Sequence, residues 1–161
     1  MSMKKVFLSL VLMLAAVSAF AQFEADKKYV GASLTSAGLS YSDTEDFAFG
    51  ANAQAGYMID RDWLAIGEVG LNYRYSDWQS VYVGARVRYF IEQNGLFLGC
   101  GARLIHEFKN FNDFQVTPEV GYCYFLNKTV TIEPSLYYDI SLSDFAHKSK
   151  VGVKIGLGLF F

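Results

Sequence analysis

Through most of the chain after residue 27, apolar side chains recur at every second position, and the positions between them are polar, charged or glycine. The pattern is clear near the end of the chain, where Val130, Ile132 and Leu136 alternate with Thr131 and Glu133. A period of two is typical of a β-strand with one apolar face. Eight such segments are separated by turn-forming residues, so the sequence predicts eight strands. They are Lys28–Tyr41, Phe47–Ile59, Trp63–Tyr75, Ser80–Ile91, Leu96–Phe108, Phe114–Leu126, Thr129–Leu142 and Ser149–Phe161.

Each predicted strand is long enough to cross a lipid bilayer, since a tilted membrane strand needs about 9–11 residues. No segment after residue 21 has the run of about 20 apolar residues that a spanning helix needs. Only helices and closed barrels pair all of their backbone groups in lipid. The predicted fold is therefore all-β: an eight-stranded antiparallel up-and-down transmembrane β-barrel, with the even strand number typical of bacterial barrels.

Two features interrupt the regular pattern. In the first predicted strand, Leu34 and Leu39 have opposite parity, which predicts a β-bulge or register shift near Ser36–Gly38. Pro118 and Pro134 lie inside predicted strands, where proline cannot donate a ladder hydrogen bond. We expect both prolines at bulges or at widely spaced positions of the ladder.

The predicted connections alternate along the chain between two sets. The first set consists of tight hairpin turns, and its Asn-Gly pair is favourable for a two-residue turn. This set is Asp60-Arg61-Asp62, Glu92-Gln93-Asn94-Gly95 and Asn127-Lys128. The second set is Ser42–Asp46, Ser76–Gln79, Lys109–Asp113 and Ser143–Lys148. If both termini are periplasmic, the first set is periplasmic and the second lies outside the cell.

The first 21 residues have the pattern of an export signal. Lys4 and Lys5 precede the apolar run Val6–Val17, and Ser18-Ala19-Phe20-Ala21 fits a small-x-small cleavage site before Gln22. An uncleaved anchor is the alternative, but the apolar run is shorter than the about 20 residues of a spanning helix. We expect a signal peptide at residues 1–21, Sec-type export, and one barrel domain at residues 22–161.

Composition limits the partners and the chemistry. The net charge is −2 and no basic run occurs, which argues against a nucleic-acid partner. Parity places Cys100 on the apolar face and Cys123 on the polar face, and residues on opposite faces of a sheet cannot form a disulfide. We therefore expect two free, sequestered thiols, and we expect no metal site, cofactor or catalytic residue.

Alternation alone does not tell which face points inward. A soluble lipocalin-like barrel, which binds a ligand, would have the apolar face inside. An eight-stranded barrel, however, has an interior just wide enough for side chains, and the glycine-rich polar face fits there more easily than the bulky apolar face. The polar face then supplies four acids and four bases to the lumen, where we expect them to form a paired network. They are Glu68, Arg86, Arg88, Arg103, Glu119, Glu133, Asp139 and Lys154.

Aromatic residues of the apolar face gather near the two ends of the predicted strands. Two aromatic girdles at the membrane interfaces are expected of a membrane barrel. The periplasmic girdle would contain Tyr57, Trp63, Tyr89, Tyr124 and Phe161, and the outer girdle Phe47, Phe49, Tyr73, Tyr75 and Phe114.

The segment Gly56–Gly67 reads as a hairpin between a Gly-Tyr strand end and an aromatic-aliphatic restart, and the closing strand ends with Phe161. With these features and its eight alternating segments, the chain resembles the small OmpX-like and OmpA-like barrels of the bacterial outer-membrane protein β-barrel domain family. The resemblance implies a location in the Gram-negative outer membrane, contact with outer-membrane lipid, and recognition of Phe161 as a signal by the β-barrel assembly machinery. The family has no shared catalytic residues to assign to this chain, and the resemblance does not extend to a peptidoglycan-binding domain.

The sequence thus favours a non-enzymatic outer-membrane barrel with a plugged, charge-balanced lumen and a structural or surface-interaction role. One alternative is a narrow channel or small-molecule carrier, in which Arg86, Arg88 and Arg103 line an anion path. Another is a lipid hydrolase or acyltransferase that uses His106 or His147, the two histidines of the chain. His106 and its neighbour Glu107 point to opposite faces of a strand and do not form a catalytic pair.

Overall fold

A computed structural model describes residues 23–39, 48–74, 77–108, 111–143 and 149–161. These residues form strands with turns between them, and the predicted signal peptide lies outside them. No helix in the described ranges is long and apolar enough to cross a membrane. The strands are β1 Lys28–Leu39, β2 Ala48–Asp60, β3 Trp63–Arg74, β4 Asp77–Phe90, β5 Leu96–Glu107, β6 Phe111–Tyr122, β7 Tyr124–Phe125, β8 Val130–Ser141 and β9 Lys150–Phe160.

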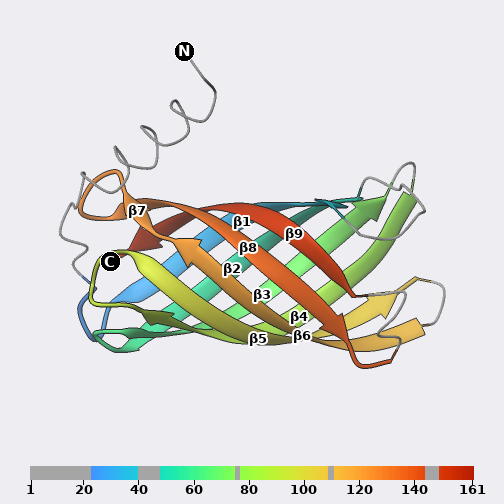
Figure 1. Cartoon of the computed structure of the whole chain (residues 1–161), viewed down its shortest axis with the longest axis horizontal. Helices are drawn as coiled ribbons and strands as arrows, with labels where there is room; N and C mark the ends of the chain where they lie inside the picture. The colour runs from blue at the N-terminus through green and yellow to red at the C-terminus, as the bar shows by residue number, and fades with distance from the viewer. Residues whose placement is uncertain (1–22, 40–47, 75–76, 109–110, 144–148) are drawn as a thin grey trace, which may run out of the picture.

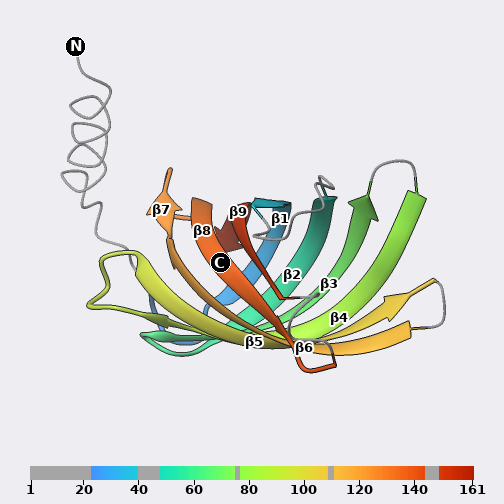
Figure 2. The same ribbon diagram turned by 45° about the vertical axis from the view of Figure 1, so that its right-hand side comes forward.

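The strands form one closed antiparallel barrel. Each strand from β1 to β5 pairs with the next along the chain, β6, β7 and β9 all pair with β8, and β1 pairs with β9. The short strand β7 continues β6 in the same register against β8, so β6 and β7 together form one of the eight strands of the barrel wall. Figures 1 and 2 show the tilted strands curving around a common axis. The predicted eight-stranded barrel is confirmed.

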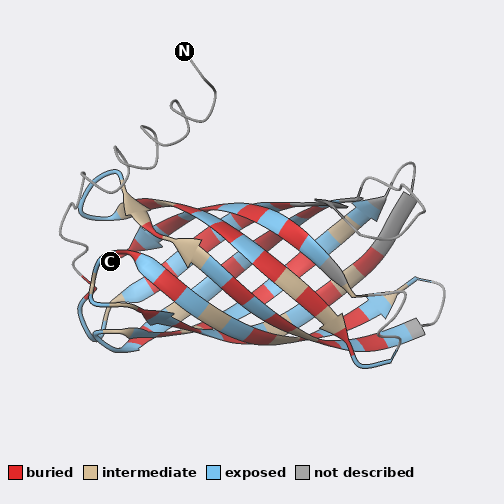
Figure 3. Ribbon diagram, in the orientation of Figure 1, coloured by how far each residue is buried: buried red, intermediate tan, exposed pale blue. Residues whose placement is uncertain are grey.

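Burial alternates along the strands, with polar residues buried inside the barrel and apolar residues exposed outside, as a membrane protein requires. The exposed positions of β9, for example, include Val153, Ile155, Leu157 and Leu159, whereas Lys154 is 1% exposed. Figure 3 shows the same alternation of buried and exposed positions on the other strands. An apolar exterior around a polar interior is the reverse of the arrangement in a soluble barrel. The lipocalin-like alternative, with its apolar interior, is therefore wrong.

The predicted irregularity in the first strand is confirmed. The register between β1 and β9 shifts between Ser36 and Leu39, which allows residues of opposite parity to follow one another. Two predicted loops are shorter than expected, because β4 begins at Asp77 and β6 at Phe111. In each case the hairpin extends beyond the predicted end of the strand, and Arg74 pairs with Asp77 across the first of them. The predicted connections Ser42–Asp46 and, in most part, Ser143–Lys148 lie outside the described residues.

The Asn-Gly pair does not form the centre of the β4–β5 turn. Glu92 and Gln93 adopt the left-handed conformation instead, with φ of 49° and 57°. The Gln93 side chain donates hydrogen bonds to the Arg61 carbonyl and the Asp62 carboxylate in the neighbouring turn. These tertiary bonds offset the cost of left-handed backbone at two residues with side chains, a contribution that local turn preferences do not include.

Neither proline causes a bulge. Residue numbers of partners in the β6–β8 and β7–β8 pairings have a constant sum, so the register does not shift at Pro118 or Pro134. Each proline instead coincides with a gap in this ladder, since proline has no N–H to donate. The gap at Pro134 also accounts for the separation of β7 from β6.

Candidate functional site: the filled lumen

The candidate site is the lumen, because alternation on six strands directs charged side chains into it. All eight predicted lumen charges are buried, none more than 5% exposed. Glu68 comes from β3, Arg86 and Arg88 from β4, Arg103 from β5, Glu119 from β6, Glu133 and Asp139 from β8, and Lys154 from β9.

Two arginines of β4 connect three carboxylates across the lumen. Arg86 Nη2 donates to Glu68 Oε1 at 2.8 Å and its Nη1 to Glu119 Oε2 at 2.6 Å. Arg88 Nε donates to Glu119 Oε1 at 2.9 Å, and its Nη1 donates to Glu133 Oε2 at 2.6 Å. The planar guanidinium has several donors in a fixed fork, which suits it to bridge two carboxylates. These residues form a continuous chain of ion pairs between β3 and β8.

Arg103 and Lys154 add further ion pairs to this network. Arg103 Nε donates to Glu68 Oε1 at 2.8 Å, and its Nη1 donates to Asp139 Oδ1 at 3.2 Å. Lys154 Nζ donates to Glu119 Oε2 at 2.5 Å, so Glu119 accepts bonds from three cations. Arg103 also lies over the Tyr82 ring, with Cζ 4.8 Å from the ring centroid. Buried charges are costly unless they are paired, and this network pairs them.

Glycine makes the space that the larger inward side chains occupy. A Cβ at Gly70 would overlap the Tyr82 ring, and a Cβ at Gly152 would overlap the Tyr137 ring. In the same way a Cβ at Gly99 would lie 2.6 Å from Glu119 Cγ. The bulky and charged side chains of one strand therefore fill the lumen over the glycines of the next.

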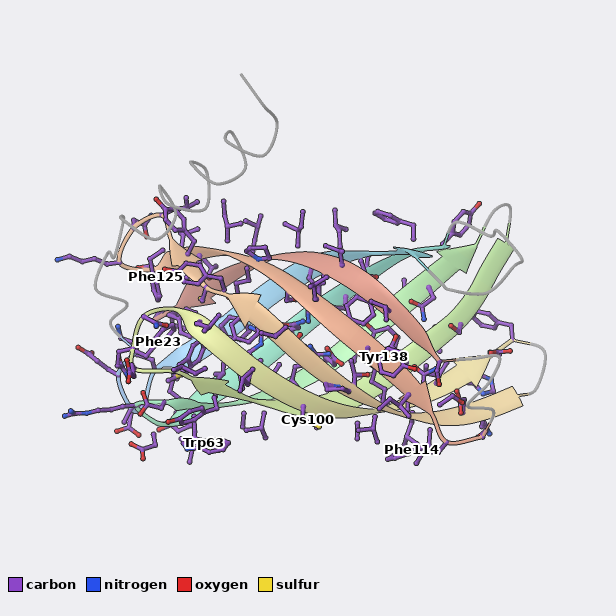
Figure 4. The ribbon with its side chains drawn as sticks, in the orientation of Figure 1. Phe23, Trp63, Cys100, Phe114, Phe125 and Tyr138 are labelled. Carbon is purple, nitrogen blue, oxygen red and sulfur yellow. The ribbon has the colours of Figure 1, made fainter. Side chains whose placement is uncertain are left out.

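The end of the lumen nearest the C-terminus is closed by apolar side chains. The Phe23 ring stacks on Phe90 with centroids 3.8 Å apart and lies edge-on to Phe125 and Phe160 at 5.3 and 5.6 Å. Phe23 precedes β1, and the backbone hydrogen bond from Asp26 N to Met58 O holds this segment against β2. Figure 4 shows Phe23 and Phe125 at the end of the barrel where the chain terminates. Sequence alternation does not predict this seal, because Phe23 lies outside any strand.

The half of the lumen away from the Phe23 cluster is polar and contains only a small cavity. Thr35, Asn72, Tyr82, Arg103 and Gln115 are among the residues around a cavity of about 20 Å³, which has room for about one water molecule. Arg103 Nη2 and Gln115 Oε1 have no hydrogen-bond partner there in the described structure. A single water is therefore the species that this cavity suits.

Asp113 is a further buried carboxylate that the sequence analysis placed in a loop. It is 3% exposed and accepts hydrogen bonds from Ser141 Oγ at 2.9 Å and from Gln115 Nε2 at 3.1 Å. Its parity matches that of Gln115, Thr117 and Glu119, and that signal could have identified it. Asp113 brings the described lumen to five carboxylates against four cations.

Most of the expected girdle residues lie on the outer surface. Figure 4 shows Trp63 and Phe114 directed away from the barrel. Tyr57, Trp63, Tyr89, Phe49, Tyr73, Phe114 and Phe161 are 38–60% exposed, Tyr124 is half-buried, and Phe47 and Tyr75 lie outside the described residues.

The remaining candidate groups are dispersed. Both cysteines are free, but only Cys123 is buried, and Cys100 is exposed on the outer surface rather than sequestered by the protein. His106 is also exposed, with Nδ1 2.7 Å from Asn112 Oδ1, and His147 lies outside the described residues. Within the described ranges, no group of three or more His, Cys, Asp and Glu side chains is arranged to hold a metal ion.

Comparison with known proteins supports the architecture. The β-barrel domain of OprF from Pseudomonas aeruginosa has a TM-score of 0.67 at 13% identity, covering 85% of this chain and 98% of that one. Neisserial surface protein A has a TM-score of 0.61 at 20% identity over 83% and 97% of the two chains. OprG from Pseudomonas aeruginosa has a TM-score of 0.56 at 13% identity over 88% and 99%. These likenesses establish the fold alone.

No protein with curated annotation matches the sequence. The sequence does match the family profile described as "Outer membrane protein beta-barrel domain", over residues 7–161. The match covers nearly the whole chain, and the inverted arrangement of apolar and polar faces agrees with it. The protein therefore belongs to the outer-membrane protein β-barrel domain family.

Proposed function

We propose that this outer-membrane barrel is closed to solutes and has a structural or surface-interaction role in the Gram-negative envelope. The observation that carries the proposal is the lumen: a continuous network of buried ion pairs crosses it, and the Phe23 cluster closes one end. Arg86, Arg88 and Arg103 donate to carboxylates instead of lining a free anion path. The same arrangement supports a role that is neither transport nor catalysis.

Conductance tests the proposal. The purified, heat-modifiable barrel is added to a planar lipid bilayer, with a heat-denatured sample as the control. We expect no stable conductance steps above that control, since paired charges and aromatic rings occupy the lumen. A large, stable and ohmic conductance would overturn the proposal and favour the channel alternative.

A second part of the proposal concerns biogenesis: export through the Sec pathway and recognition of Phe161 by the β-barrel assembly machinery. The backbone of Phe161 pairs with Lys28, and the residue is 60% exposed at the end of the closing strand. Deletion of Phe161 should lower the amount of folded protein in the outer membrane, whereas Phe161→Tyr should not. Equal amounts of all three forms would contradict the role of Phe161.

A further inference from the structure

The two prolines of the chain lie on the same seam of the barrel wall, one on each side of it. Across this seam, Leu142 N donates to Phe114 O and Leu126 N donates to Val130 O. Hydrogen-bonding direction alternates along a strand, so the even-numbered residues of β6, β7 and β8 direct their N–H groups to this seam. Pro118 and Pro134 both belong to that set.

Each proline therefore removes one hydrogen bond from the seam. The constant register places Pro118 opposite Tyr138 and Pro134 opposite Tyr122. The carbonyl groups of these two tyrosines face a ring nitrogen without hydrogen. The ladder of β5 with β4 and β6 shows no such gap. In hydrocarbon, where no water replaces a missing donor, this loss makes the β6–β8 seam weaker than its neighbours.

Side chains inside the lumen compensate at the same two points. Thr117 Oγ1 donates to Asp139 Oδ1 at 2.7 Å beside the gap at Pro118. Cys123 Sγ lies 3.7 Å from Glu133 Oε1 beside the gap at Pro134. Both carboxylates also accept hydrogen bonds from arginines of the charge network, Asp139 from Arg103 and Glu133 from Arg88.

We infer that the seam between β6/β7 and β8 is the line along which the barrel wall opens laterally, and that the charge network in the lumen holds it shut. The opening is local, because the register continues on both sides of each gap. It does not require the Phe23 cluster to move, so it is independent of whether the lumen conducts. Asp139 and Glu133 act as the lock, since each joins the seam to the network.

Residue-resolved amide exchange in lipid nanodiscs tests the inference. The Tyr138 amide faces the seam, whereas the neighbouring Tyr137 amide faces β9, so one strand supplies both the probe and its control. We expect Tyr138 to exchange about fivefold to tenfold faster, the effect of about one net hydrogen bond. Pro118→Val should bring the two rates together, because valine restores the donor. Equal rates in the native protein would overturn the inference.

A second variant keeps the test decisive if Pro118→Val fails to fold. Thr117→Val removes the side-chain bond across the seam, and we expect faster exchange at Tyr138 with little change at Tyr137. The matched control is Ser33→Ala, which removes the bond from Ser33 Oγ to Asn52 Oδ1 between β1 and β2, where the ladder is continuous. If Thr117→Val leaves Tyr138 unchanged, or if Ser33→Ala accelerates it equally, the lock is not located at this seam.

Discussion

Replacement of Glu119 by glutamine tests whether the lumen is held together by its charges. Glu119 accepts hydrogen bonds from Arg86, Arg88 and Lys154 at 2.6, 2.9 and 2.5 Å. The two arginines retain other carboxylate partners, but the ammonium group of Lys154, 1% exposed, loses its partner in the described network. Removal of one member of a buried ion pair costs about 3–5 kcal/mol. We expect Glu119→Gln to lower the free energy of unfolding by that amount, a hundredfold or more in the folding equilibrium.

The assay is reversible urea unfolding in lipid vesicles, followed by tryptophan fluorescence and by gel mobility without heating. Glu92→Gln in an exposed turn is the matched control, and it should change stability by less than about 0.5 kcal/mol. The double variant Glu119→Gln, Lys154→Met should recover part of the loss, because it removes the unpaired cation. If Glu119→Gln is as stable as Glu92→Gln, ion pairing does not determine the stability of the lumen.

Two further predictions concern packing inside and lipid outside. Gly70→Ala places a methyl group against the Tyr82 ring and should destabilise the barrel by about 1–3 kcal/mol in the same urea assay. Gly67→Ala, whose new Cβ would have its nearest neighbour at 3.9 Å, should have almost no effect, and equal losses would argue against the close inward packing. Ile155→Arg, near the middle of β9, should cost about 2–4 kcal/mol in vesicles, whereas Leu159→Arg near its end should cost about 0–1 kcal/mol. Equal costs would mean that this face does not cross a bilayer.

The sequence predicts the barrel strands well because every residue of a strand must suit either lipid or the lumen. In a barrel one face meets lipid and the other meets the filled lumen, so each step of one residue exchanges the two environments. Parity is informative only inside a strand, and the sequence does not mark where β6 begins. Asp113, whose parity matches that of Gln115, was therefore assigned to a loop. The position of Phe23 cannot be predicted from alternation, because tertiary ring contacts rather than strand pairing hold it.

Which charges pair with which is a different problem, because it depends on the stagger of strands that are not adjacent in the sheet. Arg88 on β4 reaches Glu133 on β8 across the lumen, and no local spacing in the sequence encodes that distance. The strand register, once known, shows that charged residues lie opposite glycines. Glu119 lies opposite Gly99, and Arg86 lies opposite Gly101. A Cβ at either glycine would lie within 3 Å of the charged side chain opposite it. The glycines of β5 thus leave the volume in which the charged side chains of β4 and β6 meet. The buried ion pairs therefore depend on glycine at the facing positions.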